Sequence, residues 1–163
     1  MFRYSQLLQN INEADTSILS NITTVKMYKA ITPTLSSALK YTLAFNNALY
    51  NPHSGHNSTG GGIVSSTGFK ISNDSSVNEH FLDDDGAGVL RVYYLSDTTR
   101  VYTDTTYGTV DYATGEVILT SANITSVSNV DGATSTQIRV FVVPSSNDIV
   151  PVRNQVLSID ISN

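Results

Sequence analysis

The sequence predicts a mainly β fold, an antiparallel β-sandwich or barrel-like domain preceded by a short N-terminal α-helix. Two patterns indicate this class. Short runs of β-branched and aromatic residues recur at intervals of about ten residues between turn-forming segments, which is typical of sandwiches and barrels. The apolar spacing of a helix occurs at the start of the chain. We therefore divide the chain into an N-terminal helical segment, residues 1–21, and an antiparallel β domain, residues 22–163.

The N-terminal segment carries one apolar stripe. Its four members fall at positions i, i+3, i+4 and i+7, which lie on one face of a helix: Tyr4, Leu7, Leu8 and Ile11. A second apolar pair begins at Ile18, so the helix is expected either to continue or to restart there, with Asp15 or Ser17 as the cap. A short stripe on a terminal helix has little core of its own to cover. We therefore expect it to pack on a partner or on a symmetry mate.

The rest of the chain is expected to form strands and turns. The central strand is predicted at Val89–Leu95, because this run is apolar on both faces. Thr109–Leu119 has the pattern of a hairpin whose short turn ends in Gly115 at positive φ. Residues 51–62 form a long Gly, Ser and Asn loop through which no core face can be drawn. The other expected strands are Ile22–Lys29, Leu39–Phe45, Ile63-Val64, Phe69–Ile71, His80–Leu82, Val101-Tyr102, Ile138–Val143 and Val156–Ile161, with a connecting tract of Asp, Thr and Tyr between Tyr102 and Gly108.

The composition is that of a globular domain with few charges. Hydrophobic residues make up 40% of the 163 residues and charged residues 14%, whereas Ser, Thr and Asn number 21, 19 and 14. A surface rich in hydroxyls and amides is typical of β-rich structural or extracellular proteins. The net charge of −5 and the scattered Lys and Arg argue against a cationic patch for nucleic acid or an anionic membrane. Because the chain has no Cys, it has no disulfide, thiolate metal site or Cys nucleophile.

Two histidines form the nearest approach to a metal motif. His53 and His56 are three residues apart in the predicted loop and could share a zinc ion, although a structural zinc site needs two further ligands. His80, beside Glu79, could in principle join them. We favour a solvated loop without a metal at this position.

A run of three acids, Asp83 to Asp85, precedes Gly86 and invites a calcium interpretation, because hard cations bind clustered oxygens. The EF-hand pattern fails, since it would place Phe81 and Val92 at ligand positions. We instead expect a solvated acidic turn that leads into the central strand. The segment does not read as a phosphate loop either, because it lacks the P-loop Lys and leads into a strand.

No catalytic arrangement stands out in the sequence. Ser and Asp are so frequent that a Ser-His-Asp triple can always be assembled, and no Gly-x-Ser-x-Gly elbow marks one of them. A hydrolase would need a pocket in which His and carboxylate groups converge. We therefore expect a protein that is not an enzyme and that uses no cofactor, no metal and no small-molecule substrate.

Three stretches together resemble one family. They are Phe2–Ser5 with Asp15–Asn21, the hairpin Tyr107–Gly115, and the segment Ser145–Gln155. In this order they resemble the baseplate wedge subunit of large contractile-tailed bacteriophages, a ring-forming protein related to the baseplate J-type assembly proteins. The resemblance runs through most of the chain and corresponds to a C-terminal part of a much longer protein. We expect this chain to be part of a longer one.

The resemblance implies a structural role in the virion, in the tail baseplate assembled in the host cytoplasm. Wedge subunits pair and join into the ring around the tail hub, so the partners would be other wedge proteins and copies of this chain. The alternative is a carbohydrate- or receptor-binding β-module of a tail fibre. Its contact surface would combine the loop at residues 51–62 with exposed tyrosines, although tyrosines on strands are more often half-buried. The tyrosines concerned are Tyr93, Tyr94, Tyr102, Tyr107 and Tyr112.

The segment from Pro144 to Gln155 is too long for a tight hairpin and too apolar for an ordinary solvent loop. Its prolines cannot donate a ladder hydrogen bond, and Pro151 favours an extended backbone before it. We expect an extended, partly buried connection along a sheet edge, pinned by Arg153 and Asn154. The segment either covers the core of its own domain or borders a neighbouring subunit. The second possibility makes Ile149, Val152 and Arg153 candidate interface residues together with the helix stripe.

Overall fold

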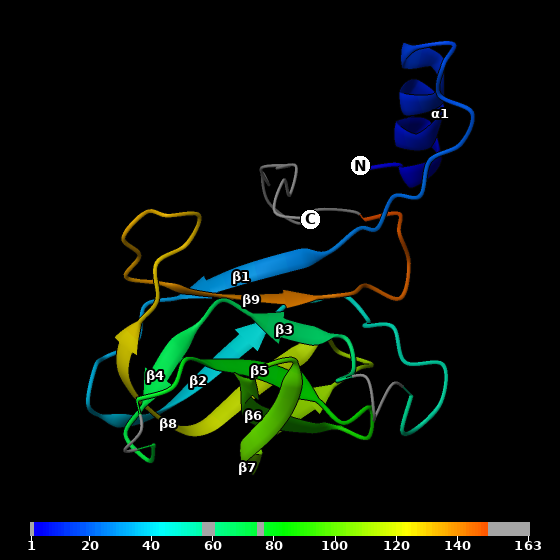
Figure 1. Cartoon of the computed structure of the whole chain (residues 1–163). Coiled ribbons are helices and arrows are strands. Elements are labelled where there is room, and N and C mark those ends of the chain that lie inside the picture. Colours follow the sequence, from blue (N-terminus) through cyan, green and yellow to red (C-terminus); the bar gives the residue numbers. More distant parts are fainter. Residues whose placement is uncertain (1, 57–60, 75–76, 150–163) are drawn as a thin grey trace. The chain divides into compact units, whose positions relative to one another are not determined.

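The computed structural model describes residues 2–56, 61–74 and 77–149. The fold is mainly β with one N-terminal helix and a barrel, as the sequence predicts (Figure 1). Two compact units are present, a terminal unit made of Met1–Val25 with Ser146–Asn163, and a β unit, Lys26–Ser145. The predicted division lies after residue 21 and assigns the C-terminal segment to the β domain. In the structure, Ser146–Ile149 group with the helix.

Helix α1 of the terminal unit spans Tyr4–Ala14. The four predicted stripe residues are half-buried, whereas every other residue of the helix is exposed. The helix ends before Asp15, whose backbone is extended. It does not restart at Ile18, because Asp15 instead forms a turn: its carboxylate accepts from the Ser17 amide at 2.8 Å and its carbonyl from the Ile18 amide at 3.1 Å.

Five antiparallel strands of the β unit close into a barrel. Each pairs with the next in the chain, and β8 pairs with β7 near its start and with β4 near its end, which completes the ring. The predicted central strand is β6, which lies between β5 and β7. A sixth strand, β2, pairs with β8 outside the ring. The bounds are β2 Ala38–Ala44, β4 Phe69–Ile71, β5 His80–Asp84, β6 Val89–Ser96, β7 Thr99–Asp111 and β8 Glu116–Val127.

A three-stranded sheet completes the β unit, in the order β1-β9-β3 (Figure 1). Its strands are β1 Met27–Ile31, β9 Ile138–Val142 and β3 Val64–Ser66. The strand predicted from Ile22 begins five residues later, at Met27. The reason is that β9 ends at Val142, the partner of Met27, so the residues before Met27 have no ladder to join.

The barrel and the three-stranded sheet share one hydrophobic core. Alternate residues of β5, β6 and β8 supply one part, and alternate residues of β9 supply another. Each such side chain stabilises the fold by about 1.5–3 kcal/mol through burial. The members with no exposed surface include Leu82, Leu90, Val92, Val117, Leu119, Ile138, Val140 and Val142.

The hairpin of β7 and β8 is longer than predicted. The expected short strand Val101-Tyr102 belongs to the 13-residue strand β7, and the tract that follows it is part of the same strand. Thr and Tyr favour strands, and Tyr107 is a core residue at 7% exposure, so this tract is not a connection. The predicted turn is present: Gly115 has φ +72°, and the Asp111 carboxylate accepts from the Ala113 and Thr114 amides at 2.9 and 3.2 Å.

The described parts of the loop before β3, residues 51–56 and 61–63, pack against the end of β5 and the turn that follows. Gly55 donates its amide to the Gly86 carbonyl at 2.9 Å, and the Asn51 side chain donates to the same carbonyl at 3.2 Å. At the far end of the loop, Gly61 is buried, and a Cβ there would overlap the Arg100 guanidinium. Gly61 is thus buried against polar side chains and does not belong to the hydrophobic core.

Replacing Gly86 by Ala tests how closely this loop approaches the turn. Gly86 has φ +74°, and a Cβ there would overlap the carbonyl oxygen of His56. Gly132 has φ +76° with open space around it, so Gly132→Ala measures the backbone strain alone. We expect Gly132→Ala to lower the free energy of unfolding by about 1 kcal/mol and Gly86→Ala by at least about 2 kcal/mol in urea titrations. Equal losses would mean that the loop does not pack on Gly86.

Candidate functional site

The terminal unit contains the predicted interface residues that the structure describes. Tyr4, Leu7, Leu8 and Ile11 lie along one face of α1, and no residue of the helix is buried. Ile149 is half-buried. The other two predicted interface residues, Val152 and Arg153, lie outside the described residues, as does the strand predicted at residues 156–161.

The start of α1 is hydrogen-bonded to residues 148 and 149. Phe2 and Ile149 exchange two backbone hydrogen bonds, with N–O distances of 3.0 and 3.3 Å. Arg3, at the N-cap position, makes no side-chain cap. Instead the Asp148 carboxylate accepts from the Tyr4 amide at 2.8 Å, so an acid from another segment satisfies a free N–H and faces the positive end of the helix dipole.

The segment after the helix is tied to its first turn. The Tyr4 hydroxyl donates to the Thr23 carbonyl at 2.6 Å. Together, these contacts fix Tyr4 through both its backbone and its side chain. Sequence reasoning missed Phe2 and Asp148, because a pairing between residues more than 140 positions apart leaves no local pattern. It also missed Thr23, which takes part through its backbone carbonyl, a group that every residue has.

The described part of the segment from Pro144 has paired backbone at both ends. Pro144 is buried and pairs with Leu49, and the Ser145 amide donates to the Ala48 carbonyl at 2.9 Å. Ile149 pairs with Phe2 as described above. The residues between them, 145–148, are exposed. Arg153 and Asn154, expected to pin the segment, lie outside the described residues.

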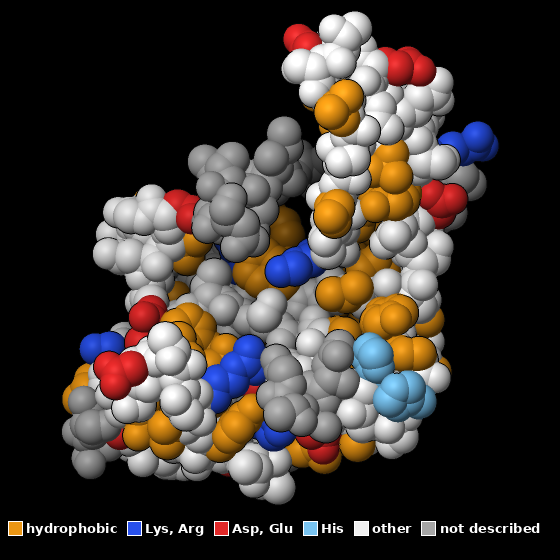
Figure 2. Space-filling model, turned by 45° about the vertical axis from the view of Figure 1, so that its right-hand side comes forward, with side chains coloured by type: hydrophobic (Ala, Val, Ile, Leu, Met, Phe, Trp, Pro, Cys, Tyr) orange, Lys and Arg blue, Asp and Glu red, His pale blue; other side chains and the backbone are white. Residues whose placement is uncertain are grey.

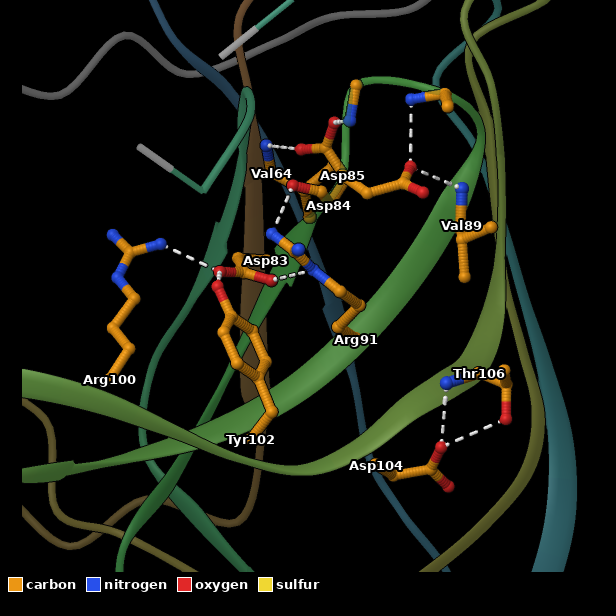
Figure 3. Close-up of polar contacts among 12 residues, drawn as sticks. Val64, Asp83, Asp84, Asp85, Val89, Arg91, Arg100, Tyr102, Asp104 and Thr106 are labelled. Atoms are coloured by element: carbon orange, nitrogen blue, oxygen red, sulfur yellow. Dashed lines mark hydrogen bonds and ion pairs between the residues drawn. The ribbon is translucent and has the colours of Figure 1, made fainter. Parts of the chain in front are cut away.

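The acidic run is not the solvated turn that the sequence predicts. Asp83 and Asp84 are the last two residues of β5 and are 1% and 0% exposed. Consecutive strand residues point to opposite faces, so the two carboxylates enter different surroundings. Asp83 accepts from Arg91 Nε at 2.9 Å, Arg100 Nη1 at 2.7 Å and the Tyr102 hydroxyl at 2.9 Å (Figure 3).

Asp84 accepts mainly from the backbone. One carboxylate oxygen receives the amides of Ile63 and Val64, both at 2.7 Å, where β3 begins. The other receives the Tyr112 hydroxyl at 2.6 Å and the Gly86 amide at 3.2 Å. Burial and the neighbouring Asp84 carboxylate raise the pKa of Tyr112, so its hydroxyl stays a donor.

Asp85 completes the turn by accepting the Ala87 and Val89 amides at 2.8 and 2.9 Å (Figure 3). Each carboxylate of the run thus accepts hydrogen bonds from donors of the protein itself. In the part of the chain that the structure describes, no three His, Cys, Asp or Glu side chains form a group that could hold a metal ion. The hydrogen bonds of the acidic run link the end of β5 to β6, β7 and the start of β3.

His80 does not join the other two histidines. Its side chain is fully buried in β5, with Nδ1 3.0 Å from the Asn78 carbonyl and Nε2 3.0 Å from Thr103 Oγ1. Burial lowers the pKa of His80. The Asp74 carboxylate, 3.3 Å from Nε2, acts in the opposite direction but does not outweigh the burial. His53 and His56 lie in the loop before β3, and their ring nitrogens are 3.2 Å apart.

The tyrosines of the strands are engaged within the β unit. Tyr102 and Tyr112 donate to the two buried carboxylates, and Tyr107 is in the core. The Tyr93 ring lies 6.0 Å from that of Tyr102, and the Arg100 guanidinium lies 4.6 Å above Tyr93. Tyr93 and Tyr102 are half-buried strand residues, as expected, whereas Tyr107 is buried and Tyr112 is half-buried just after β7.

Comparison of the chain with protein-family models, curated proteins and solved structures finds no match. Among the described residues, α1 is too short and too polar to be a membrane-spanning helix.

The Asp83 cluster predicts a large loss of stability when its charge is removed. Asp83→Asn keeps the shape of the side chain but leaves Arg91 and Arg100 without their shared carboxylate, so we expect the free energy of unfolding to fall by at least about 2 kcal/mol. The matched control is Asp97→Asn in the exposed turn after β6, where we expect a change within about 0.5 kcal/mol. A similar small change in both variants would contradict the structural role of Asp83.

The Asp148 contact predicts a local effect on the helix. Asp148→Ala removes the acceptor of the Tyr4 amide and should destabilise α1 by about 1 kcal/mol. Hydrogen exchange of the α1 amides should accelerate, while the amides of β6 and β8 keep their protection. Asn147→Ala, at the exposed neighbouring position, is the control. Unchanged exchange in Asp148→Ala would show that the carboxylate does not cap the helix.

Proposed function

We propose that the chain is a structural component of a contractile phage tail baseplate wedge and that it acts through protein–protein contacts during assembly. Its partners are other wedge proteins and copies of itself, and its location is the virion. The proposal rests first on the resemblance of three stretches to the wedge subunit, given above.

One structural observation carries the proposal further. Two of the three resembling stretches, one beginning at Phe2 and the other containing Ile149, pair with each other through backbone hydrogen bonds. They are therefore parts of one module. The same module displays the apolar stripe of α1, none of whose residues is buried. A fastened helix with an apolar face suits a contact with another subunit.

The third resembling stretch, the β7–β8 hairpin, makes packing contacts inside the β unit. Its Tyr112 hydroxyl donates to Asp84, and its turn packs so closely that a Cβ on Gly115 would overlap the Asn47 carbonyl. This stretch supports the β unit, and the terminal unit supplies the contacts in assembly.

The alternative is a carbohydrate- or receptor-binding β-module of a tail fibre. The neighbouring aromatic rings of Phe81, Tyr93 and Tyr102 favour it, because they lie side by side on β5, β6 and β7 with centroids 5.8 and 6.0 Å apart. A glycan array distinguishes the two functions. Binding of a glycan that Tyr93→Ala abolishes would support the alternative.

The assembly function predicts that the helix stripe mediates association. We expect the full chain to self-associate in size-exclusion chromatography with light scattering, and Leu7→Gln/Ile11→Gln to abolish this association. The melting temperature of the β unit should stay the same, because neither side chain is buried. The control is Leu19→Gln/Ile22→Gln, which replaces two apolar side chains that are 94% and 99% exposed and lie outside the helix. A wild-type chain that is monomeric at all concentrations, or equal disruption by the control, would contradict self-association through the stripe.

A further inference from the structure

Two imidazoles meet in the turn at residues 53–56 of the β unit. His56 Nδ1 lies 3.2 Å from His53 Nε2, and the two rings are nearly perpendicular with centroids 4.9 Å apart. His53 is exposed and His56 half-exposed, so both are accessible from solvent. Figure 2 shows pale-blue imidazoles next to each other at the surface, beside hydrophobic side chains.

A hydrogen bond sets the tautomer of His53. Its Nδ1 lies 3.2 Å from the Ser54 carbonyl, which only accepts, so Nδ1 carries the proton and Nε2 presents a lone pair. The lone pair points to the space that it shares with His56 Nδ1. When the His56 proton resides on Nε2, two lone pairs converge there. A metal-binding histidine is oriented in the same way, by donating its other ring N–H to a carbonyl or carboxylate.

The separation of the two nitrogens fits one metal ion. Nitrogens that each lie about 2.0–2.1 Å from a shared ion, at tetrahedral or square-planar angles, are about 2.9–3.4 Å apart. The observed 3.2 Å lies within this range. A small rotation of either ring turns its lone pair from the opposite nitrogen toward a common ion.

The turn is held in place before any ion arrives. Its Gly55 amide donates to the Gly86 carbonyl at 2.9 Å, and the His56 amide donates to the His53 carbonyl at 3.1 Å. The edge of the His56 ring also packs against Tyr50, with ring centroids 5.4 Å apart. Pre-ordered ligands lose less conformational freedom on binding, so two imidazoles can bind more tightly here than on a free chain.

From this geometry we propose that His53 and His56 form a binding site for a divalent transition-metal ion. Imidazole nitrogens suit Cu²⁺, Ni²⁺ and Zn²⁺, and the usual order of stability makes Cu²⁺ the tightest of the three. Ca²⁺ and Mg²⁺, which prefer oxygen ligands, do not compete. Water or a donor from another molecule fills the remaining coordination positions. The site is independent of the assembly function proposed above.

Titration of the tag-free full chain with CuCl₂, NiCl₂ or ZnCl₂ in a calorimeter tests the site. We expect one saturable ion per chain, and an affinity at least about tenfold lower in His53→Gln and in His56→Gln, because one imidazole cannot chelate. Ser54→Ala keeps the backbone carbonyl and should bind as the wild type does. Melting curves in EDTA check that all variants fold alike.

Electron paramagnetic resonance of the Cu²⁺-loaded wild-type chain gives a second readout that needs no variant. We expect hyperfine splitting from two imidazole nitrogens. Absence of saturable binding, binding that survives in His53→Gln/His56→Gln, or a spectrum with a single coupled imidazole would each overturn the proposal.

Discussion

The β unit depends on the burial of two adjacent carboxylates at the end of β5. A buried charge is costly unless donors satisfy it fully, and Asp83 and Asp84 point to opposite faces of their strand. Asp83 therefore needs the arginines of β6 and β7, whereas Asp84 needs the start of β3 and the β7–β8 hairpin. The position at which the barrel meets the three-stranded sheet is fixed by this pair. Removal of either set of donors would leave an unpaired charge inside the fold.

The same constraint places residues 61–63, the described end of the loop before β3. Asp84 receives the Ile63 and Val64 amides, so the chain has to pass directly over the end of β5. Only glycine fits there: a Cβ on Gly61 or Gly62 would overlap Arg100 or Asp84, and both have positive φ. Gly86, held by Asp84, then positions the turn that carries the two surface histidines. The described glycines at the end of this loop are therefore required by close packing, which the composition alone does not indicate.

The sequence predicts the parts of the fold that depend on local pattern. The stripe of α1, the existence of strand β6 and the β7–β8 turn follow from helical periodicity, from a continuous apolar run and from one glycine at positive φ. The prediction for Asp83 and Asp84 was wrong, because consecutive acids before a glycine resemble a solvated turn. Their partners, Arg91 and Arg100, come from strands whose register no local pattern defines. The pairing of Phe2 with Ile149 could not be predicted either, because no local pattern joins residues so far apart in the sequence.

The terminal unit has a different energetic basis from the β unit. An isolated helix of 11 residues is marginal in water, and α1 buries none of its residues. The described hydrogen bonds hold its first turn, through Asp148 and Thr23, and reach its last turn only through the Asn21 side chain, which donates to the Asn12 side chain. If a neighbouring subunit covers the stripe formed by Tyr4, Leu7, Leu8 and Ile11, the burial of those side chains stabilises the helix and the contact together. Helix formation and assembly are then linked, so each is weaker without the other.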